Sequence, residues 1–219
     1  MQHTSLSNTS EGKIFFAGLI GVDLYLTALL LSWVFLPEFY QPFAGMTFGN
    51  ILFGRAAGIT IGYAAGLETW PVVGVNFVVE LLTVLVIYPL FIFSWNQMLH
   101  FKRLKKWMDR QHVFVEKYHD KIHKYGLYGL FAFVWFPFWM TGPAVGAMIG
   151  YVMGLRHIVT LSVVLSGTLL AIFGWAWFLN ALQKWAESID PRAPWLIVGL
   201  IIGLVLIGFL LRKFTKHTE

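Results

Sequence analysis

The sequence predicts an all-α integral membrane protein with about four spanning helices, two re-entrant hairpins in an inverted repeat, and a cytoplasmic amphipathic helix. The class follows from composition: 58% of the 219 residues are hydrophobic and 12% are charged, against about a quarter charged in soluble domains. The hairpins follow from apolar segments, one in each half, that glycine, proline or charge interrupts. We expect residues 1–219 to form a single transmembrane domain.

The first apolar run, residues 14–36, is 23 residues long and can cross a hydrocarbon core of about 30 Å. The sequence before it lacks a basic n-region and a small-residue cleavage site, so we expect the span to be retained. Asp23 lies within this span and is a candidate proton-coupling residue, with a position at the interface as the equal alternative. Residues 37–42, which begin and end with proline, are expected to form a short polar link.

The first predicted repeat, residues 37–95, contains a glycine-rich hairpin at residues 43–67. Gly58 and Gly62 belong to this hairpin, and Arg55 lies in its middle. A charge at the centre of a span costs at least about 2.5 kcal/mol on insertion scales. Arg55 therefore needs a partner or an aqueous cavity.

A long helix over residues 69–95 completes this repeat. It carries Asn76 and Glu80 four residues apart, on one helical face. Glu80 would take up a proton if unpaired, or stay ionised beside Arg55. The alternative is a buried ion pair that only fixes packing.

The linker, residues 96–124, holds eight Lys or Arg residues against three acids, which keeps it cytoplasmic. Its apolar residues recur at helical spacing, which predicts an amphipathic helix in the interface. Its histidines, His112, His119 and His123, could bind a divalent metal or sense pH. A solvated face is the interpretation that we favour, and we predict no metal and no cofactor. The net charge of +5 is explained by this linker and the tail, so nucleic acid is not an expected partner.

The second predicted repeat, residues 125–182, contains the other hairpin. No Asp, Glu, Lys or Arg occurs from residue 125 to 155, yet proline should break a helix there. Residues 146–155 match residues 58–67 at six of ten positions. Close helix packing also explains the glycines, but not the prolines in front of them. The hairpin residues in this half are Pro137, Gly142, Pro143 and Gly146.

A helix over residues 158–182 and a last span at 194–211 follow. The basic residues after this span favour a cytoplasmic C-terminus. If linker and tail are both cytoplasmic, the second hairpin enters and leaves on the cytoplasmic side and the first on the outer side. We therefore expect both termini in the cytoplasm, and a prokaryotic inner membrane as the location.

The residues around the second hairpin resemble the small multidrug export protein family, which is distantly related to the DedA and VTT (SNARE-associated) membrane proteins. That family has a Tyr-Gly-Leu-like entry before a Pro-Leu-Pro-Gly-Thr-Gly-Ala-Trp-Thr-Gly-Ala-like signature. The entry stands here as residues 125–127, and the signature matches at Pro137, Thr141, Gly142, Gly146 and Ala147. Trp139 and Met140 replace the family's second proline and glycine. In the first half, Arg55 is present and the acid expected before it is missing. DedA relatives are implicated in moving polyprenyl phosphate or phospholipid.

The resemblance implies a transporter of a lipid or an amphipathic anionic substrate, with coupling to protons as a further expectation. Membrane lipid and a small amphipathic substrate are the expected partners, and a homo-oligomer is possible. The substrate-binding candidates are Arg55, Glu80, Asn76, Thr141 and Arg156, and the proton-coupling candidates are Glu80 and Asp23. Two alternatives are a small cation or drug exporter, and a membrane scaffold that acts through its basic amphipathic helix. No HExxH or GxSxG motif is present, so an enzyme is not expected.

Overall fold

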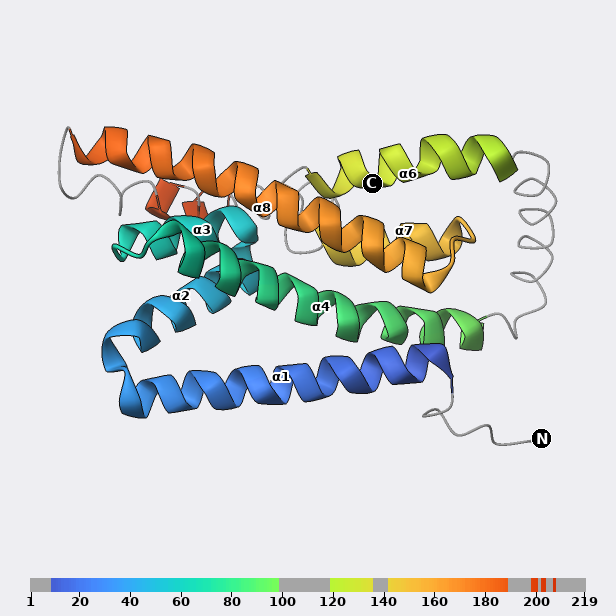
Figure 1. Ribbon diagram of the computed structural model, residues 1–219, viewed down its shortest axis with the longest axis horizontal. Helices are drawn as coiled ribbons and strands as arrows, with labels where there is room; N and C mark the ends of the chain where they lie inside the picture. Colours follow the sequence, from blue (N-terminus) through green and yellow to red (C-terminus); the bar gives the residue numbers. More distant parts are fainter. Residues whose placement is uncertain are drawn as a thin grey trace. The chain divides into compact units, whose positions relative to one another are not determined.

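The computed structural model is helical, without strands, in the part of the chain that it describes, which is residues 9–98, 119–135, 142–188, 198–200, 202–203 and 207. Three helices are long and apolar enough to cross a membrane: α1 (Ser10–Phe35), α4 (Thr69–Met98) and α8 (His157–Glu187) (Figure 1). They confirm the prediction of an all-helical membrane protein. Most of the predicted span at 194–211 lies outside the described residues, as do residues 99–118 with His112.

The first predicted hairpin contains two antiparallel helices, α2 (Pro37–Phe53) and α3 (Arg55–Ala64), which Gly54 alone separates (Figure 1). A methyl group added at Gly45 would touch Ile61 at 3.1 Å, and one at Gly49 would crowd Ile61 Cδ1 at 2.5 Å. Glycine therefore lets the two helices close against each other.

The prediction that residues 37–42 form a link is wrong, because they are the first turns of α2. Pro37 is the first residue of this helix, where the missing N–H costs nothing and the fixed φ suits a helix. The amides of Phe39 and Tyr40 both donate to the carbonyl of Leu36, at 3.0 and 3.2 Å. The chain thus changes direction at Leu36 without a polar loop.

Of the second predicted hairpin, around Pro137, Gly142, Pro143 and Gly146, the structure describes one short apolar helix, α7 (Gly142–Val152). This helix packs against α6 (His119–Trp135), which ends before Pro137. A Cβ at Gly146 would lie 2.7 Å from Val134 Cγ2, and one at Gly150 would lie 3.3 Å from Leu130 Cδ2. Contacts that run in opposite directions along the two helices make the pair antiparallel. The connection at residues 136–141, with Pro137 and Thr141, lies outside the described residues.

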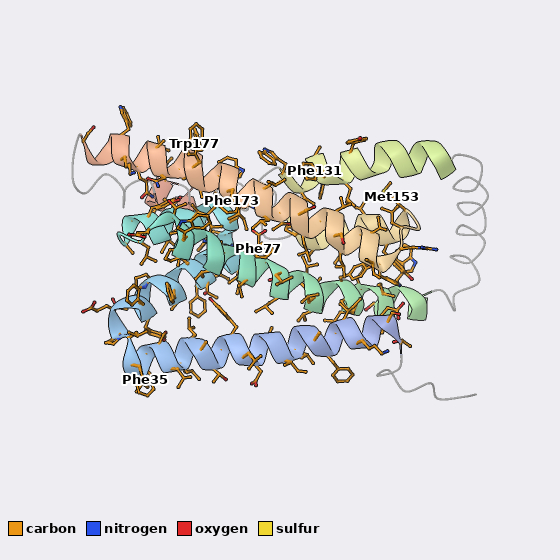
Figure 2. The ribbon with its side chains drawn as sticks, viewed as in Figure 1. Phe35, Phe77, Phe131, Met153, Phe173 and Trp177 are labelled. Atoms are coloured by element: carbon orange, nitrogen blue, oxygen red, sulfur yellow. The ribbon has the colours of Figure 1, made fainter. Side chains whose placement is uncertain are left out.

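The chain divides into two compact units, each with its own core. The first unit comprises residues 1–26, 80–136 and 141–169, and its core includes Val84, Tyr88, Leu130, Val134, Ala147 and Val164. The second comprises residues 27–79, 137–140 and 170–219, and its core includes Met46, Ile59, Tyr63, Val72, Ile172 and Ala176. Phe77 and Phe173, labelled in Figure 2, pack against the second core.

The same internal contacts occur in both units at a shift of 88 positions, the shift that takes residue 58 to residue 146. Gly58 faces Met46 and Asn76, and Gly146 faces Val134 and Val164. Gly62 faces Val72, and Gly150 faces Thr160. Under the same shift, Met46 corresponds to Val134, Asn76 to Val164 and Val72 to Thr160.

The helix ends repeat in the same way. Gly66 and Gly154 have φ of +80° and +75°, which glycine adopts without strain. The amide of Leu67 donates to the Gly62 carbonyl and that of Leu155 to the Gly150 carbonyl, both at 3.1 Å. Each is the longer hydrogen bond of a Schellman cap, which ends α3 or α7 before a long helix begins.

Candidate functional site

The tip of the α2–α3 hairpin is built around Gly54, which has φ +87° and ψ 174°. Only glycine adopts this region of backbone space readily. The Gly54 amide donates to the Asn50 carbonyl at 2.9 Å, and its own carbonyl accepts from the Ala57 amide at 3.1 Å. Arg55 is therefore the first residue of α3, and it is buried with 5% of its surface exposed.

Two asparagines form a buried polar pair within the same unit as Arg55. The Asn50 Nδ2 donates to Asn76 Oδ1 at 2.8 Å, and the Asn76 Nδ2 donates to the Val72 carbonyl at 2.8 Å. The first bond ties α2 to α4, and the second lies within α4. They also fix the orientation of both amide groups, because each Nδ2 faces an oxygen.

Gly58 makes room for this pair. A Cβ at Gly58 would collide with Asn76 Oδ1 and would lie 2.9 Å from the Met46 carbonyl oxygen. The backbone of α3 therefore touches the asparagine pair directly. One turn of helix separates Gly58 from Arg55, so the polar pair and the guanidinium belong to the same end of the hairpin.

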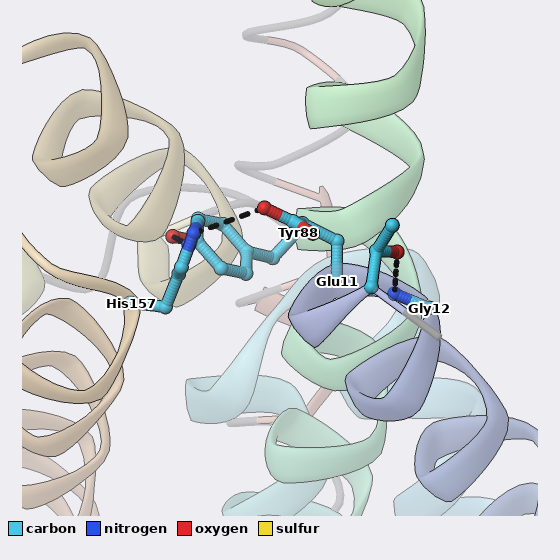
Figure 3. Close-up of polar contacts among 5 residues, drawn as sticks. Glu11, Gly12, Tyr88 and His157 are labelled. Carbon is cyan, nitrogen blue, oxygen red and sulfur yellow. Dashed lines mark hydrogen bonds and ion pairs between the residues drawn. The ribbon is translucent and has the colours of Figure 1, made fainter. Parts of the chain in front are cut away.

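A second polar cluster joins three helices within the first unit (Figure 3). His157, the first residue of α8, lies 2.7 Å through Nδ1 from the Tyr88 hydroxyl and 3.1 Å through Nε2 from Glu11 Oε1. A Tyr88 hydroxyl that donates to Nδ1 leaves the proton on Nε2 for Glu11, so one chain of hydrogen bonds links α4, α8 and α1. Tyr151 stacks on the His157 ring with centroids 6.0 Å apart.

The position of Glu11 is set by the start of α1. Thr9 Oγ1 accepts a hydrogen bond from the Gly12 amide at 3.1 Å, which is the N-cap interaction. This cap places Glu11 in the first turn, where a carboxylate also interacts favourably with the helix dipole. Glu11 is thereby directed toward His157.

A family model described as "Putative small multi-drug export protein" matches residues 55–173, which is more than half of the chain. The chain belongs to this family. Searches of curated proteins and of solved structures returned no match. The family's name implies a transporter rather than an enzyme, and its matched region begins at Arg55 and continues through α7 into α8.

The residues expected to form the site of this export-family protein occupy different environments. Glu80 is buried with 7% exposed and lies one turn beyond Asn76 on α4. It opens the first compact unit, whereas Arg55 belongs to the second, so their pairing stays a prediction. Asp23 and Arg156 are exposed, and Thr141 lies outside the described residues.

The remaining hairpin glycines and proline of the family member are placed as expected for close packing. Gly58, Gly62, Gly142, Pro143 and Gly146 are all buried. The His119 and His123 backbones belong to α6. No group of three or more metal-ligating side chains occurs among the described residues.

Sequence reasoning missed the cluster of Glu11, Tyr88 and His157. The three residues come from distant parts of the chain, and each has an ordinary local role as a first-turn acid, a core tyrosine or a helix start. The signal that could have found them is the internal repeat. Tyr151 and His157 correspond to Tyr63 and Thr69, and that pair is also in contact, at 3.3 Å.

Proposed function

We propose that this small multidrug export family protein is a transporter that moves a lipid or another amphipathic molecule with an anionic head group across the bilayer. A phospholipid and a polyprenyl phosphate both have this chemistry. The proposal is carried by one observation: Arg55 is buried at the start of α3, directly after the break at Gly54.

The hairpin tip combines two sources of attraction for an anion. A guanidinium forms paired hydrogen bonds with phosphate oxygens. The first amides of a helix add partial positive charge to the same point. Asn76 supports the tip, because its amide is already bonded to Asn50 and the Val72 carbonyl. Thr141 and Arg156 are proposed contacts for the second hairpin and the mouth of the pathway.

Coupling to protons is proposed for Glu80, with Asp23 as the second candidate. A carboxyl group buried in a span can exchange a proton when its surroundings change between two conformations. The two hairpins are proposed to enter the bilayer from opposite sides, as an inverted repeat. The recurring contacts at a shift of 88 positions support a repeat, and the side of entry is open to direct test.

The test is transport by the purified full chain in liposomes. Fluorescent phospholipid and farnesyl phosphate are placed in one leaflet, and their appearance in the other is followed with an impermeant quencher. We expect Arg55→Gln to slow transport at least about tenfold, because it removes a charge-assisted pair. Lys13→Gln is the matched control, since Lys13 is exposed on α1. Wild-type transport by a folded Arg55→Gln protein would contradict the proposal.

A second candidate function is export of a small organic cation, which the burial of Glu80 favours. In that case Glu80 and Asp23 bind the cargo, and Arg55 is a structural counter-ion. Glu80→Gln discriminates between the two functions. It should spare movement of an anionic lipid more than it spares export of a cationic dye, with both cargoes measured in the same liposomes.

A further inference from the structure

A cavity of about 470 Å³ lies within the second compact unit, where α3 ends, α4 begins and α8 approaches its C-terminus. Its volume falls within the range of small-molecule sites, about 300 to 1,000 Å³. None of the residues predicted from the sequence as substrate-binding lines it. Its lining includes Glu68, Thr69, Trp70, Gln183 and Lys184.

Gln183 lines this cavity although it is buried, with 2% of its surface exposed. Its Nε2 donates to the Thr60 carbonyl at 2.9 Å, so the amide cannot be turned over without placing two oxygens in contact. The Oε1 atom is consequently an acceptor, and no described residue donates to it. A buried acceptor without a donor costs about 1 to 3 kcal/mol, and an N–H or O–H group that reached Oε1 from the cavity would remove this cost.

The rim adds charge of both signs and an aromatic face. Glu68 and Lys184 line the cavity and are exposed, and neither forms an ion pair with another described residue. Trp70 is 72% exposed, and its ring packs edge-on against Phe173 with centroids 5.8 Å apart. An indole face attracts an ammonium group, and indole rings are favoured where apolar tails meet polar head groups.

Hydrogen bonds among the lining residues join the three helices around the cavity. Thr69 Oγ1 accepts from Asn180 Nδ2 at 3.2 Å, and the Tyr63 hydroxyl lies 3.3 Å from the same oxygen. These contacts hold the start of α4 against α8 and the end of α3. A ligand therefore meets a formed site rather than a collapsed one.

We propose that this cavity binds the head group of an amphipathic molecule that carries a primary ammonium, with Gln183 Oε1 and Glu68 receiving the N–H groups. Lys184 receives a neighbouring phosphate when the ligand is zwitterionic. The inference goes beyond the proposed function, since it assigns a second head-group site whose lining does not include Arg55. Two sources share this chemistry: an ethanolamine phospholipid and a free amphipathic amine.

The experiment compares head groups of equal charge, of which one has N–H donors and the other carries methyl groups in their place. Calorimetric titration of the detergent-purified full chain is carried out with dihexanoyl phosphatidylethanolamine and with its choline analogue. We expect the ethanolamine lipid to bind at least about tenfold more tightly, because a trimethylammonium group cannot donate to Gln183. Decylamine and decyltrimethylammonium form a second pair without phosphate.

Variants locate the binding. Glu68→Gln changes one exposed rim carboxylate and should reduce the preference for the primary amine to about threefold or less. Gln183→Leu should abolish the preference, and its thermal unfolding shows whether the loss of the Thr60 bond also harms the fold. Glu38→Gln is the matched control, because Glu38 is exposed on α2 and does not line the cavity.

The outcomes of these titrations distinguish ammonium binding at the cavity from the proposed transport function. Tighter binding of both primary amines supports the site, and a preference for the ethanolamine lipid over decylamine identifies a phospholipid as the source. Equal binding of ethanolamine and choline lipids by the wild-type chain would overturn the inference, and so would a preference that survives in Glu68→Gln and in folded Gln183→Leu. Lipid movement in liposomes tests the proposed function separately, so binding without transport contradicts only that function.

Discussion

At the scale of single residues, the asparagine pair shows how a buried polar group is made specific. Asn76 is fully buried, and both ends of its amide are used, by Asn50 and by the Val72 carbonyl. Replacement by an apolar residue leaves the Asn50 amide without its acceptor, whereas the Val72 carbonyl keeps its bond to the backbone amide of residue 76. The pair therefore contributes most to choosing one packing of α2 on α4 over others.

We predict that Asn76→Leu lowers the free energy of unfolding by about 1 to 3 kcal/mol, because the buried Asn50 amide loses its acceptor, Asn76 Oδ1. Thermal unfolding in detergent measures the loss. Ser166→Ala is the control, since its hydroxyl is exposed and bonds only within its own helix, at 3.1 Å. Equal melting temperatures for Asn76→Leu and wild type would show that the pair contributes no stability.

Gly58→Ala tests how closely α3 packs against α2 and α4. Gly58→Ala places a Cβ against Asn76 Oδ1 and the Met46 carbonyl oxygen, so α3 must move away from α2 and α4. Overpacking of this kind costs about 1 to 3 kcal/mol. Gly74→Ala on α4 is the matched control, because nothing lies within 4 Å of its Cβ position. Similar unfolding for the two variants would refute the close contact.

At the scale of elements, Gly54 is the residue that separates α2 from α3. Gly54→Ala forces a side chain into φ +87°, ψ 174°, at a cost of about 1 to 3 kcal/mol. We expect a lower melting temperature, and also slower transport than stability alone explains, because the start of α3 and Arg55 shift. Gly129→Ala, which has open space around its Cβ position, serves as the control.

The hydrogen-bonded chain of Glu11, His157 and Tyr88 joins α1, α4 and α8 within the first unit. Tyr88→Phe should destabilise the protein by about 1 kcal/mol, because His157 Nδ1 loses its hydrogen-bond partner. A double-mutant cycle with Glu11→Gln measures whether the two contacts act together. Tyr128→Phe is the control, since Tyr128 is 71% exposed. Strict additivity would mean that the two contacts are independent.

The sequence predicted the long helices well because their signal is local. A run of apolar residues long enough to span a bilayer needs no knowledge of distant contacts, and α1, α4 and α8 all followed this rule. The start of α2 was harder to predict, because a proline such as Pro37 can either follow the end of one helix or be the first residue of the next. The His157 cluster and the cavity around Gln183 were not found, because each depends on side chains brought together from distant positions.

At the scale of the whole molecule, the side from which each hairpin enters the membrane is the central prediction. Glu68 and Arg156 are exposed residues that correspond under the shift of 88 positions. The sequence contains no cysteine, so single substitutions to cysteine need no altered background. We expect Glu68→Cys and Arg156→Cys to react with an impermeant maleimide from opposite sides of oriented vesicles. Reaction from the same side would exclude an inverted repeat.

The two units share their packing but not their chemistry. Arg55 and Asn76 of the second unit correspond to Pro143 and Val164 of the first, and Glu80 corresponds to Thr168. A cargo that passed both hairpins would thus meet an ionic attraction at one hairpin and no charged side chain at the corresponding position of the other. Such a difference makes the path chemically asymmetric, with stronger binding at one end than at the other, although the two halves repeat the same backbone contacts.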